Sequence, residues 1–304
     1  MTGTIRRSAP AAQWAIGILA GPSPLQLAPM GGAANPVLRG SSLRGVHAGF
    51  VADPFMVRQG DLWHMFFELW NEESGRGEIG HASSLDGRRW DFGGVVLREA
   101  FHLSYPHVFH WQGDCYMTPE TLGAGCVRLY RARRFPDRWE CAAEIIPGGC
   151  ADPTPFRFDG RWWLFACSNA ATHDVLDLYG AERLEGPWHR HPANPIVSGD
   201  ARRSRPAGRV AAWNGGLLRF AQDCVPAYGT AVRAFHVTTL TPTAYRDEEA
   251  LENPVLAPGS VAWCARGMHH VDAHLLPDGS WIACVDGRPA APGGPEAPRA
   301  AGAP

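Results

Sequence analysis

The sequence lacks the features of several large protein classes. Its 304 residues carry a formal net charge of −2, so no basic field is present that would hold nucleic acid nonspecifically. A run of about 18 apolar residues is absent, so no membrane span is expected. The N-terminus lacks the apolar segment of a signal peptide. A P-loop, a Rossmann glycine pattern and a GxSxG elbow are also missing.

The spacing of the cysteines argues against a structural zinc site. None of the eight forms a C-x-x-C pair, so a structural zinc knuckle is not expected, and we predict neither a metal nor another cofactor. Together with the missing signal peptide, this pattern predicts a cytoplasmic protein with reduced thiols. The oligomeric state stays open.

What the sequence does contain is one phrase repeated five times. A few apolar or mixed residues lead into a tight turn with a glycine, and an aromatic-rich stretch follows. The copies read VRQGDLWHMFFE, FHWQGDCYMTPE, FRFDGRWWLFAC, AAWNGGLLRFAQD and LLPDGSWIACVD. Glycine accepts the positive φ of hairpin turns, so each phrase predicts two strands joined at Gly60, Gly113, Gly160, Gly215 or Gly279. Repetition of all-β units at this spacing is typical of propeller blades.

The repeats predict an all-β fold, a single five-bladed β-propeller over residues 13–288, with disordered tails at 1–12 and 289–304. The expected blades span about 50–100, 101–147, 148–197, 198–257 and from about 260 onward. The last blade is short, and two strands alone would leave an open edge. We therefore expect a strand over Gln13 to Leu19 to complete it and close the ring.

The five inner strands are expected to start around the propeller axis. They read ADPFMVR, SYPHVFHW, ADPTPFRF, RPAGRVAAW and HHVDAHLL. Residues near their starts should meet although they lie far apart in sequence: Asp53, Tyr105, Asp152, Arg205 and His270.

Three acidic residues are the candidates for catalysis. Asp53 and Asp152 occupy equivalent places in the repeated phrase ADP, and two carboxylates in one cavity raise one pKa, as glycoside hydrolysis needs. The alternative is that each Asp caps a turn before its proline. Glu120 ends the second strand of its blade in YMTPE, as Glu68 does in the first blade. It is either a general acid or a solvated strand end.

Further positions on the inner strands are candidates for substrate binding. Arg205 and Arg209 in SRPAGR would lie on one face of a strand, where a guanidinium pair suits an anionic ligand. The alternative is ordinary salt bridges. His270 and Asp272 in HHVDAH share a strand face with His274. Such residues are about 7 Å apart on a strand, so hydrogen bonds to a polar ligand are favoured over metal binding. His102, Tyr105 and His107 in FHLSYPHVF are candidate pocket liners.

These motifs resemble known families. The paired ADP phrases, the glycine hairpins and LEGPW followed by NPI are similar to the five-bladed propellers of glycoside hydrolase families 43, 32 and 68. A closer resemblance is to the amino-terminal propeller of plant glucosamine inositolphosphorylceramide transferases and their bacterial relatives. The segments that carry it include FVADPFMV, YMTPE, RFAQDC, YGTAVRAF and GMHHVDAH. RFAQDC adds Gln222 and Asp223 to the substrate-binding candidates.

The glycosidase resemblance implies roles for the acids. Asp53 would be the base or nucleophile, and Asp152 would tune a general acid. That pattern places an acidic Glu roughly 50 residues after the second Asp, where this chain has RRSRPAGRV and no carboxylate. Glu120 and Asp223 are the candidates that would substitute for it in space, although neither matches the motif.

The sequence thus predicts a carbohydrate-active propeller that hydrolyses or transfers at a glycosidic bond of a sugar or glycan with an anionic group. Two alternatives stay open. One is a noncatalytic glycan-binding propeller associated with glycosyltransferase systems, and the other is a protein-interaction propeller.

Overall fold

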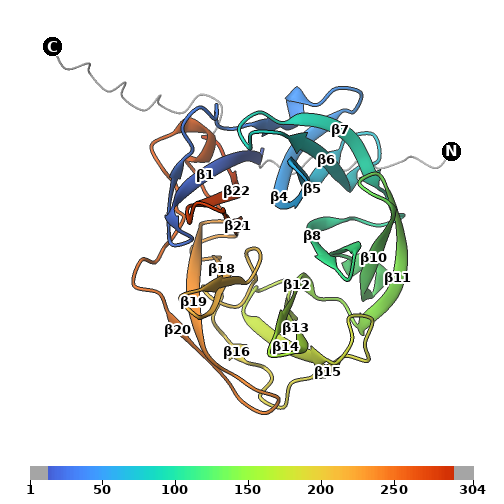
Figure 1. The fold of residues 1–304 in the computed structure, drawn as a ribbon, viewed down its shortest axis with the longest axis vertical. Helices are drawn as coiled ribbons and strands as arrows, with labels where there is room; N and C mark the ends of the chain where they lie inside the picture. Colours follow the sequence, from blue (N-terminus) through green and yellow to red (C-terminus); the bar gives the residue numbers. More distant parts are fainter. Residues whose placement is uncertain (1–12, 291–304) are drawn as a thin grey trace.

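The computed structural model describes residues 13–290. Apart from Pro289 and Ala290, the predicted tails lie outside the described residues. Five antiparallel sheets form a ring around a common axis (Figure 1). This confirms the predicted all-β five-bladed propeller.

The first four sheets follow chain order from the axis outward. The first consists of β4 (Ala48–Gln59), β5 (Leu62–Asn71), β6 (Arg76–Ser84) and β7 (Asp91–Leu97). The second consists of β8 (Ser104–Trp111), β9 (Asp114–Glu120), β10 (Cys126–Arg134) and β11 (Arg138–Pro147). The third consists of β12 (Ala151–Phe158), β13 (Arg161–Cys167), β14 (Val175–Ala181), β15 (His189–Arg190) and β16 (Val197–Ser198). The fourth consists of β17 (Ala211–Trp213), β18 (Gly216–Asp223), β19 (Ala231–Leu240) and β20 (Tyr245–Glu249).

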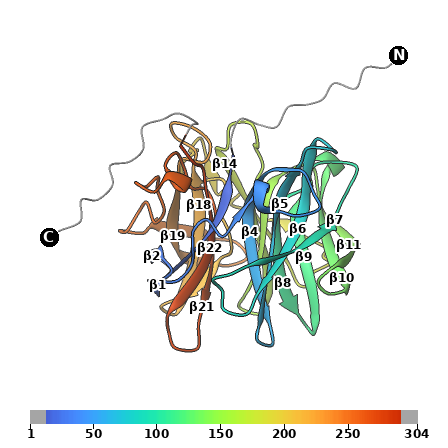
Figure 2. The same cartoon turned by 90° about the horizontal axis from the view of Figure 1, so that it is seen from above.

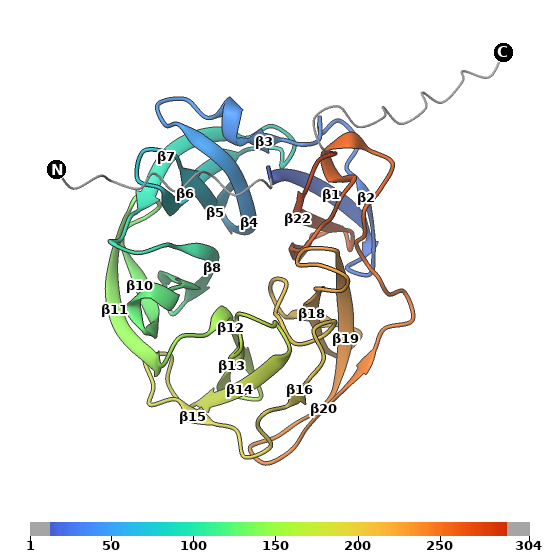
Figure 3. The ribbon, with the colours of Figure 1, turned by 180° about the vertical axis from the view of Figure 1, so that it is seen from behind.

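The fifth sheet joins the two ends of the described chain. It consists of β21 (Val271–Leu275), β22 (Trp281–Gly287), β1 (Ala15–Ser23), β2 (Gln26–Pro29) and β3 (Leu38–Arg39). Strand β1 pairs antiparallel with β22 from Ala15 opposite Gly287 to Gly21 opposite Trp281. Figure 3 shows β1 lying between β22 and β2 at this closure. The predicted closing strand is confirmed, although it starts two residues later and extends further than Leu19.

Helical structure is limited to three short 3₁₀ turns within residues 13–290. They are η1 (Gly40–Ser42), η2 (Leu122–Ala124) and η3 (Ala262–Cys264). In that part of the chain we find no helix with the length and apolar character needed to traverse a bilayer.

The hairpin turns follow from their sequences. Gly113, Gly160 and Gly215 have φ values of 89°, 74° and 77°, and the residue before each also has a positive φ. Two consecutive positive φ values define the turn that matches the twist of a hairpin. The glycines of the repeated phrase therefore mark the inner hairpins.

The inner strand of the fourth blade differs from its prediction. We expected RPAGRVAAW to be one strand, but β17 covers only Ala211–Trp213. Pro206 has no N–H to donate, and Gly208 has a φ of 131°. A Cβ at Gly208 would lie 1.8 Å from the Val271 carbonyl oxygen, so the chain passes the fifth blade as irregular backbone.

The hydrophobic core lies between the blades. Each of the five seams between neighbouring sheets holds its own buried cluster. Figure 2 shows the sheets turned by 90° from the view of Figure 1. Representative pairs from facing blades are Phe55 with Val108, Phe109 with Trp162, Phe165 with Val210, Phe220 with Trp281, and Ile18 with Met56. A sixth cluster of Trp14, Phe50, Ala52 and Trp70 lies apart from these seams.

Candidate functional site at the propeller axis

Three inner strands carry the same distortion near their starts. Asp53, Tyr105 and Asp152 each precede a proline, and their φ values are 51°, 48° and 52°. The strand register shifts at each of these positions, as in a β-bulge. Such backbone costs about 1–3 kcal/mol for a residue other than glycine. The repeated phrase therefore encodes a strained bulge that redirects one side chain per blade.

Residues that start different inner strands do meet at the axis. The Tyr105 N–H donates to Asp53 Oδ2 at 3.2 Å. His270 Nδ1 lies 3.9 Å from Asp53 Oδ1, and Arg205 Nε donates to Asp152 Oδ2 at 2.6 Å. The ring architecture thus brings together the five predicted positions.

Arg205 is hydrogen-bonded to several residues in the acidic part of this site. Besides Asp152, its guanidinium donates to Glu120 Oε2 at 3.4 Å and to His173 Nδ1 at 3.0 Å. Gln222 Nε2 donates to Asp152 Oδ2 at 2.8 Å, and the Asp152 N–H donates to Glu120 Oε2 at 3.2 Å. Asp152 is 1% exposed and Arg205 is 9% exposed, so both are buried as a hydrogen-bonded unit.

The site holds more carboxyl groups than cations, which shifts their pKa values. Burial and the Asp152 charge raise the pKa of Glu120 to about 8, although Arg205 opposes the shift. Burial raises the pKa of Asp53 to about 7 against the opposing charge of His269. Burial, followed by the Asp53 charge, raises the pKa of Glu68 well above its usual range. The site therefore retains protons at neutral pH.

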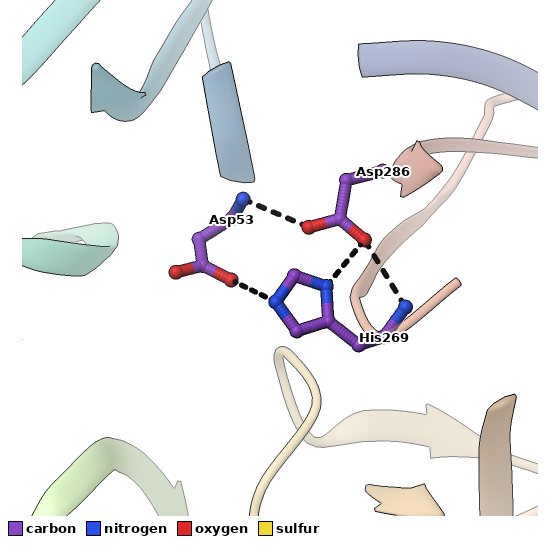
Figure 4. Close-up of side chains that lie close together, drawn as sticks. All are labelled: Asp53, His269 and Asp286. Carbon is purple, nitrogen blue, oxygen red and sulfur yellow. Dashed lines mark hydrogen bonds and ion pairs between the residues drawn. The ribbon is translucent and has the colours of Figure 1, made fainter. Parts of the chain in front are cut away.

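Asp53 is linked through a histidine to a second aspartate (Figure 4). His269 Nδ1 lies 2.7 Å from Asp286 Oδ1, and its Nε2 lies 3.5 Å from Asp53 Oδ1. The Asp53 N–H donates to Asp286 Oδ2 at 3.0 Å. Burial lowers the pKa of His269, but the charges of Asp286 and Asp53 outweigh it and the net shift is upward. Both acids therefore favour the protonated form of His269.

The same three residues offer ligand atoms within 4.8 Å of one another, which is the spacing of a metal site. The separation of 2.7 Å between His269 Nδ1 and Asp286 Oδ1 is that of a hydrogen bond, so these two atoms are already paired with each other. Ion pairing and hydrogen bonds account for the cluster, and it gives no ground for assigning a metal.

A pocket of about 270 Å³ opens beside this cluster. Its lining residues come from both ends of the chain and from three blades: Trp14, Phe50, Ala52, Glu68, Trp70, His102, Tyr228, His269 and Arg288. Trp14 stacks on His269 with ring centroids 4.0 Å apart, and Phe50 stacks near Trp70 at 6.0 Å. The sixth hydrophobic cluster is thus the aromatic wall of this pocket.

Glu68 is the carboxyl group that lines the pocket. It is 6% exposed, and its Oε1 lies 3.4 Å from His102 Nε2. Burial lowers the pKa of His102, so the imidazole is neutral when Glu68 carries its proton. The pair offers uncharged hydrogen-bond donors and acceptors to a ligand.

Tyr105 and His107, predicted as pocket liners, and His270, predicted to bond a polar ligand, lie at the axis instead. The Tyr105 hydroxyl bonds to Thr154 Oγ1 at 2.8 Å and accepts from the Gly208 N–H at 2.7 Å. His107 and His270 are fully enclosed, and their ring nitrogens have no hydrogen-bond partner among residues 13–290. None of the three belongs to the pocket lining.

Arg209 and Asp272 form a separate clamp. Arg209 Nε donates to Asp272 Oδ1 at 2.8 Å, and its Nη2 donates to the Val108 carbonyl at 2.8 Å. His274 Nε2 lies 2.8 Å from Asp272 Oδ2. Burial opposes ionisation of Asp272, but Arg209 and His274 hold its pKa well below its usual range. The clamp ties the blades together across the axis.

Two predictions therefore need correction. Arg205 and Arg209 do not form a guanidinium pair, because the segment between them is not a strand and the alternation of faces does not apply. Each is already bound to a different aspartate. Asp223 is engaged by Arg202 at 3.3 Å and Arg233 at 2.8 Å and does not join the axial cluster.

Sequence reasoning missed several residues of the site. His269, Asp286 and Tyr228 were not proposed, and Glu68 was noted only as a match to Glu120. The repeat pattern was sufficient to predict Asp286, because it lies in the last part of the second strand of its blade, as Glu68 and Glu120 do. Trp14 and Tyr228 had no such signal, since they lie outside the repeated phrase.

The fold and the site together define a five-bladed propeller with a buried acidic cluster and an aromatic pocket at its axis. Residues 7–288 match the family described as glucosamine inositolphosphorylceramide transferase 1, N-terminal, and the chain belongs to that family. The predicted family resemblance is confirmed.

A curated relative is the glucosamine inositolphosphorylceramide transferase 1 of Oryza sativa subsp. japonica. The two sequences are 37% identical over an alignment 302 residues long, and the alignment covers 90% of this chain and 40% of the relative. The chain thus spans less than half the length of the rice protein.

Solved structures with similar folds come from carbohydrate-active proteins. The β-1,2-mannobiose phosphorylase of Listeria innocua has a TM-score of 0.63 at 12% identity, covering 84% of this chain and 95% of that one. A thermostable family-43 glycoside hydrolase has a TM-score of 0.57 at 13% identity, covering 78% and 88%. At these identities the likeness shows the fold alone.

Proposed function

We propose that the axial pocket binds a sugar and that this propeller is a glycan-recognition domain. The observation that carries the proposal is the pocket wall of Trp14, Phe50, Trp70 and Tyr228 around the polar groups of Glu68, His102 and His269. Aromatic faces pack against the apolar faces of a sugar ring, while a few placed polar groups bond its hydroxyls.

An unsatisfied donor in the pocket supports the same proposal. Trp70 Nε1 is buried and has no acceptor among residues 13–290. A buried donor without a partner costs about 1–3 kcal/mol, so a ligand oxygen near Trp70 would gain binding energy.

Binding is favoured over hydrolysis by the position of Arg205. Glycoside hydrolysis needs one carboxyl group as acid and another as base or nucleophile. Here the region expected to supply an acidic Glu supplies Arg205, which binds both Asp152 and Glu120. Neither carboxylate is then available for a substrate.

Substitution of Trp70 by alanine is expected to weaken sugar binding about tenfold or more, because a stacking face and a donor are lost. Isothermal titration of the full chain with a panel of neutral and anionic saccharides measures the effect. Trp213→Ala is the matched control, since Trp213 is a half-buried tryptophan outside the pocket. Equal affinity in the wild type and the Trp70 variant, or no binding of any saccharide, contradicts the proposal.

The names of the relatives suggest the setting of this binding. Curated relatives of this family are transferases of glucosamine inositolphosphorylceramide by name, and the present chain matches about two fifths of the rice protein. We propose that the chain serves a glycosyltransferase system by holding a glycan. A cytoplasmic location stays a prediction.

A second candidate is hydrolysis or transfer at a glycosidic bond. It is favoured by the pKa of Asp53 near 7 and by the raised pKa of Glu68 in the adjoining pocket. In this mechanism Asp53 accepts a proton from water, and Glu68, in place of Glu120, protonates the leaving oxygen. His269 would stabilise the charge that Asp53 carries.

Asp53→Asn separates the two candidates. If catalysis occurs, this variant is expected to lose at least about a hundredfold in turnover while keeping its melting temperature near that of the wild type. The exposed Asp61→Asn is the control. Reducing-sugar release from the saccharide panel gives the measurement. Absence of turnover in the wild type removes the second candidate and leaves the binding proposal intact.

A further inference from the structure

Arg288 is the cationic residue at the edge of the axial pocket. It follows β22 directly and belongs to the pocket lining. Its guanidinium lies over the Trp14 ring at 5.5 Å from the centroid, and its Nη2 donates to the Arg266 carbonyl at 2.9 Å. Trp14 in turn stacks on His269, so the guanidinium is held against the aromatic wall.

This arginine has no acidic partner. Among residues 13–290 no carboxylate oxygen lies within 4.0 Å of Arg288, and its Nε is buried without any acceptor. By contrast, Arg205 and Arg209 each bind an aspartate. A partly buried guanidinium without an anion is an unfilled site for one.

Arg266, whose backbone is hydrogen-bonded to that of Arg288, adds a second positive charge. The Arg266 N–H donates to the Arg288 carbonyl at 2.9 Å, which fixes the two arginines side by side. Burial, followed by the Arg266 charge, lowers the pKa of Arg288. Arg266 is itself exposed and has no salt bridge within the described residues. The Arg266 charge therefore disfavours the charged form of Arg288, and a bound oxyanion would offset that repulsion.

We propose that Arg288, supported by Arg266, is an anion subsite of the sugar pocket and that it takes the carboxylate or phosphate group of an acidic sugar. This inference rests on the proposed sugar binding and specifies its ligand class. The ring of the sugar would lie against the Trp14 and Trp70 side of the pocket, and its oxyanion would accept from the Arg288 guanidinium. A fixed guanidinium fork suits the paired oxygens of either group.

The subsite differs from the anion site expected from the sequence. Arg205 and Arg209 are occupied by Asp152 and Asp272, so neither has a free charge for a ligand. Arg288 lies in the short segment after the last strand, where no motif marked it. The anionic ligand expectation is retained, but the residue that would carry it changes.

Calorimetric titration of the full chain with three probes tests the subsite: D-glucose, D-glucuronate and D-glucose 6-phosphate. At low salt we expect at least one acidic probe to bind about 10- to 100-fold more tightly than D-glucose, and the advantage to shrink as salt is raised. The two acidic probes distinguish a uronate from a phosphorylated sugar.

The variant Arg288→Gln is expected to lose about tenfold or more in affinity for the acidic probe while its affinity for D-glucose stays within about twofold. Arg266→Gln keeps its backbone contacts and should show a smaller loss in the same direction. Arg246→Gln, an exposed arginine on β20 without a salt bridge among the described residues, is the control and should change nothing. Melting temperatures show that each variant is folded.

The remaining outcomes distinguish failure of the anion subsite from failure of the proposed sugar binding on which it rests. Equal binding of all three probes, or an acidic preference that survives in Arg288→Gln, overturns the anion subsite and leaves sugar binding standing. Failure of every probe to bind overturns both.

Discussion

A chain truncated at its N-terminus, starting at Pro24, is expected to lose its cooperative unfolding transition or to melt far below the full-length protein. The deletion removes all of β1, which pairs with β22 over its length and carries the fully buried Ile16 and Ile18. Loss of each such side chain costs about 2–5 kcal/mol, and a typical domain is stable by only about 5–15 kcal/mol. The edge of β22 would also lose its hydrogen-bonding partner.

Thermal unfolding followed by circular dichroism measures this effect. A truncation that starts at Gln13 is the control, because it removes none of the described strands. Ile18→Ala provides a graded version and should lower the free energy of unfolding by about 2–5 kcal/mol. An unchanged melting temperature after loss of β1 would show that the ring does not depend on this closure.

Replacement of Arg205 by alanine is expected to be the most damaging single change at the axis. It leaves Asp152 and Glu120 buried without their cation, and breaking a buried ion pair in this way costs about 3–5 kcal/mol. Arg202→Ala is the matched control. Arg202 is half-exposed and its partner Asp223 keeps Arg233, so a change below about 1 kcal/mol is expected.

The deficit caused by Arg205→Ala should depend on pH. The pKa of Glu120 is already raised to about 8 in the folded protein, above the value near 4 of an unfolded chain. The folded state therefore binds more protons than the unfolded state, and the contribution of Glu120 to stability falls as pH rises from about 4 to about 8. Loss of the opposing charge raises this pKa further.

Urea denaturation at pH 5 and pH 8 measures that dependence. The difference between the variant and the wild type should be smaller at pH 5, where protons replace the missing cation. Combining Arg205→Ala with Asp152→Asn should recover part of the stability at pH 8. A deficit that is the same at both pH values would mean that the buried charges are not its cause.

The hydrogen-bond partners at the axis show why the site was harder to predict than the fold. The equivalence of Asp53 and Asp152 followed from a repeated phrase, and both residues lie at the axis in matching bulges. Their surroundings nevertheless differ: Asp53 faces His269, whereas Asp152 is bound by Arg205 and Gln222. A repeat specifies the position of a residue in its own blade, but its partners come from the other blades.

The pocket was hard to predict for the same reason, because its residues come from different parts of the chain. Trp14 comes from the segment before the closing strand, Tyr228 from the connection between β18 and β19, and Arg288 from the residue after β22. These segments have no common pattern and meet only because the ring closes. No spacing rule would have joined them.

The sequence by itself determined the hairpins, the number of blades and the closure of the ring, because turn glycines and buried strand residues act locally and recur in every blade. Only the tertiary structure decided which acids are bound by arginine, which carboxyl group lines the pocket and which cation lacks a partner. These properties depend on distances between side chains of different blades and on the burial that their meeting produces.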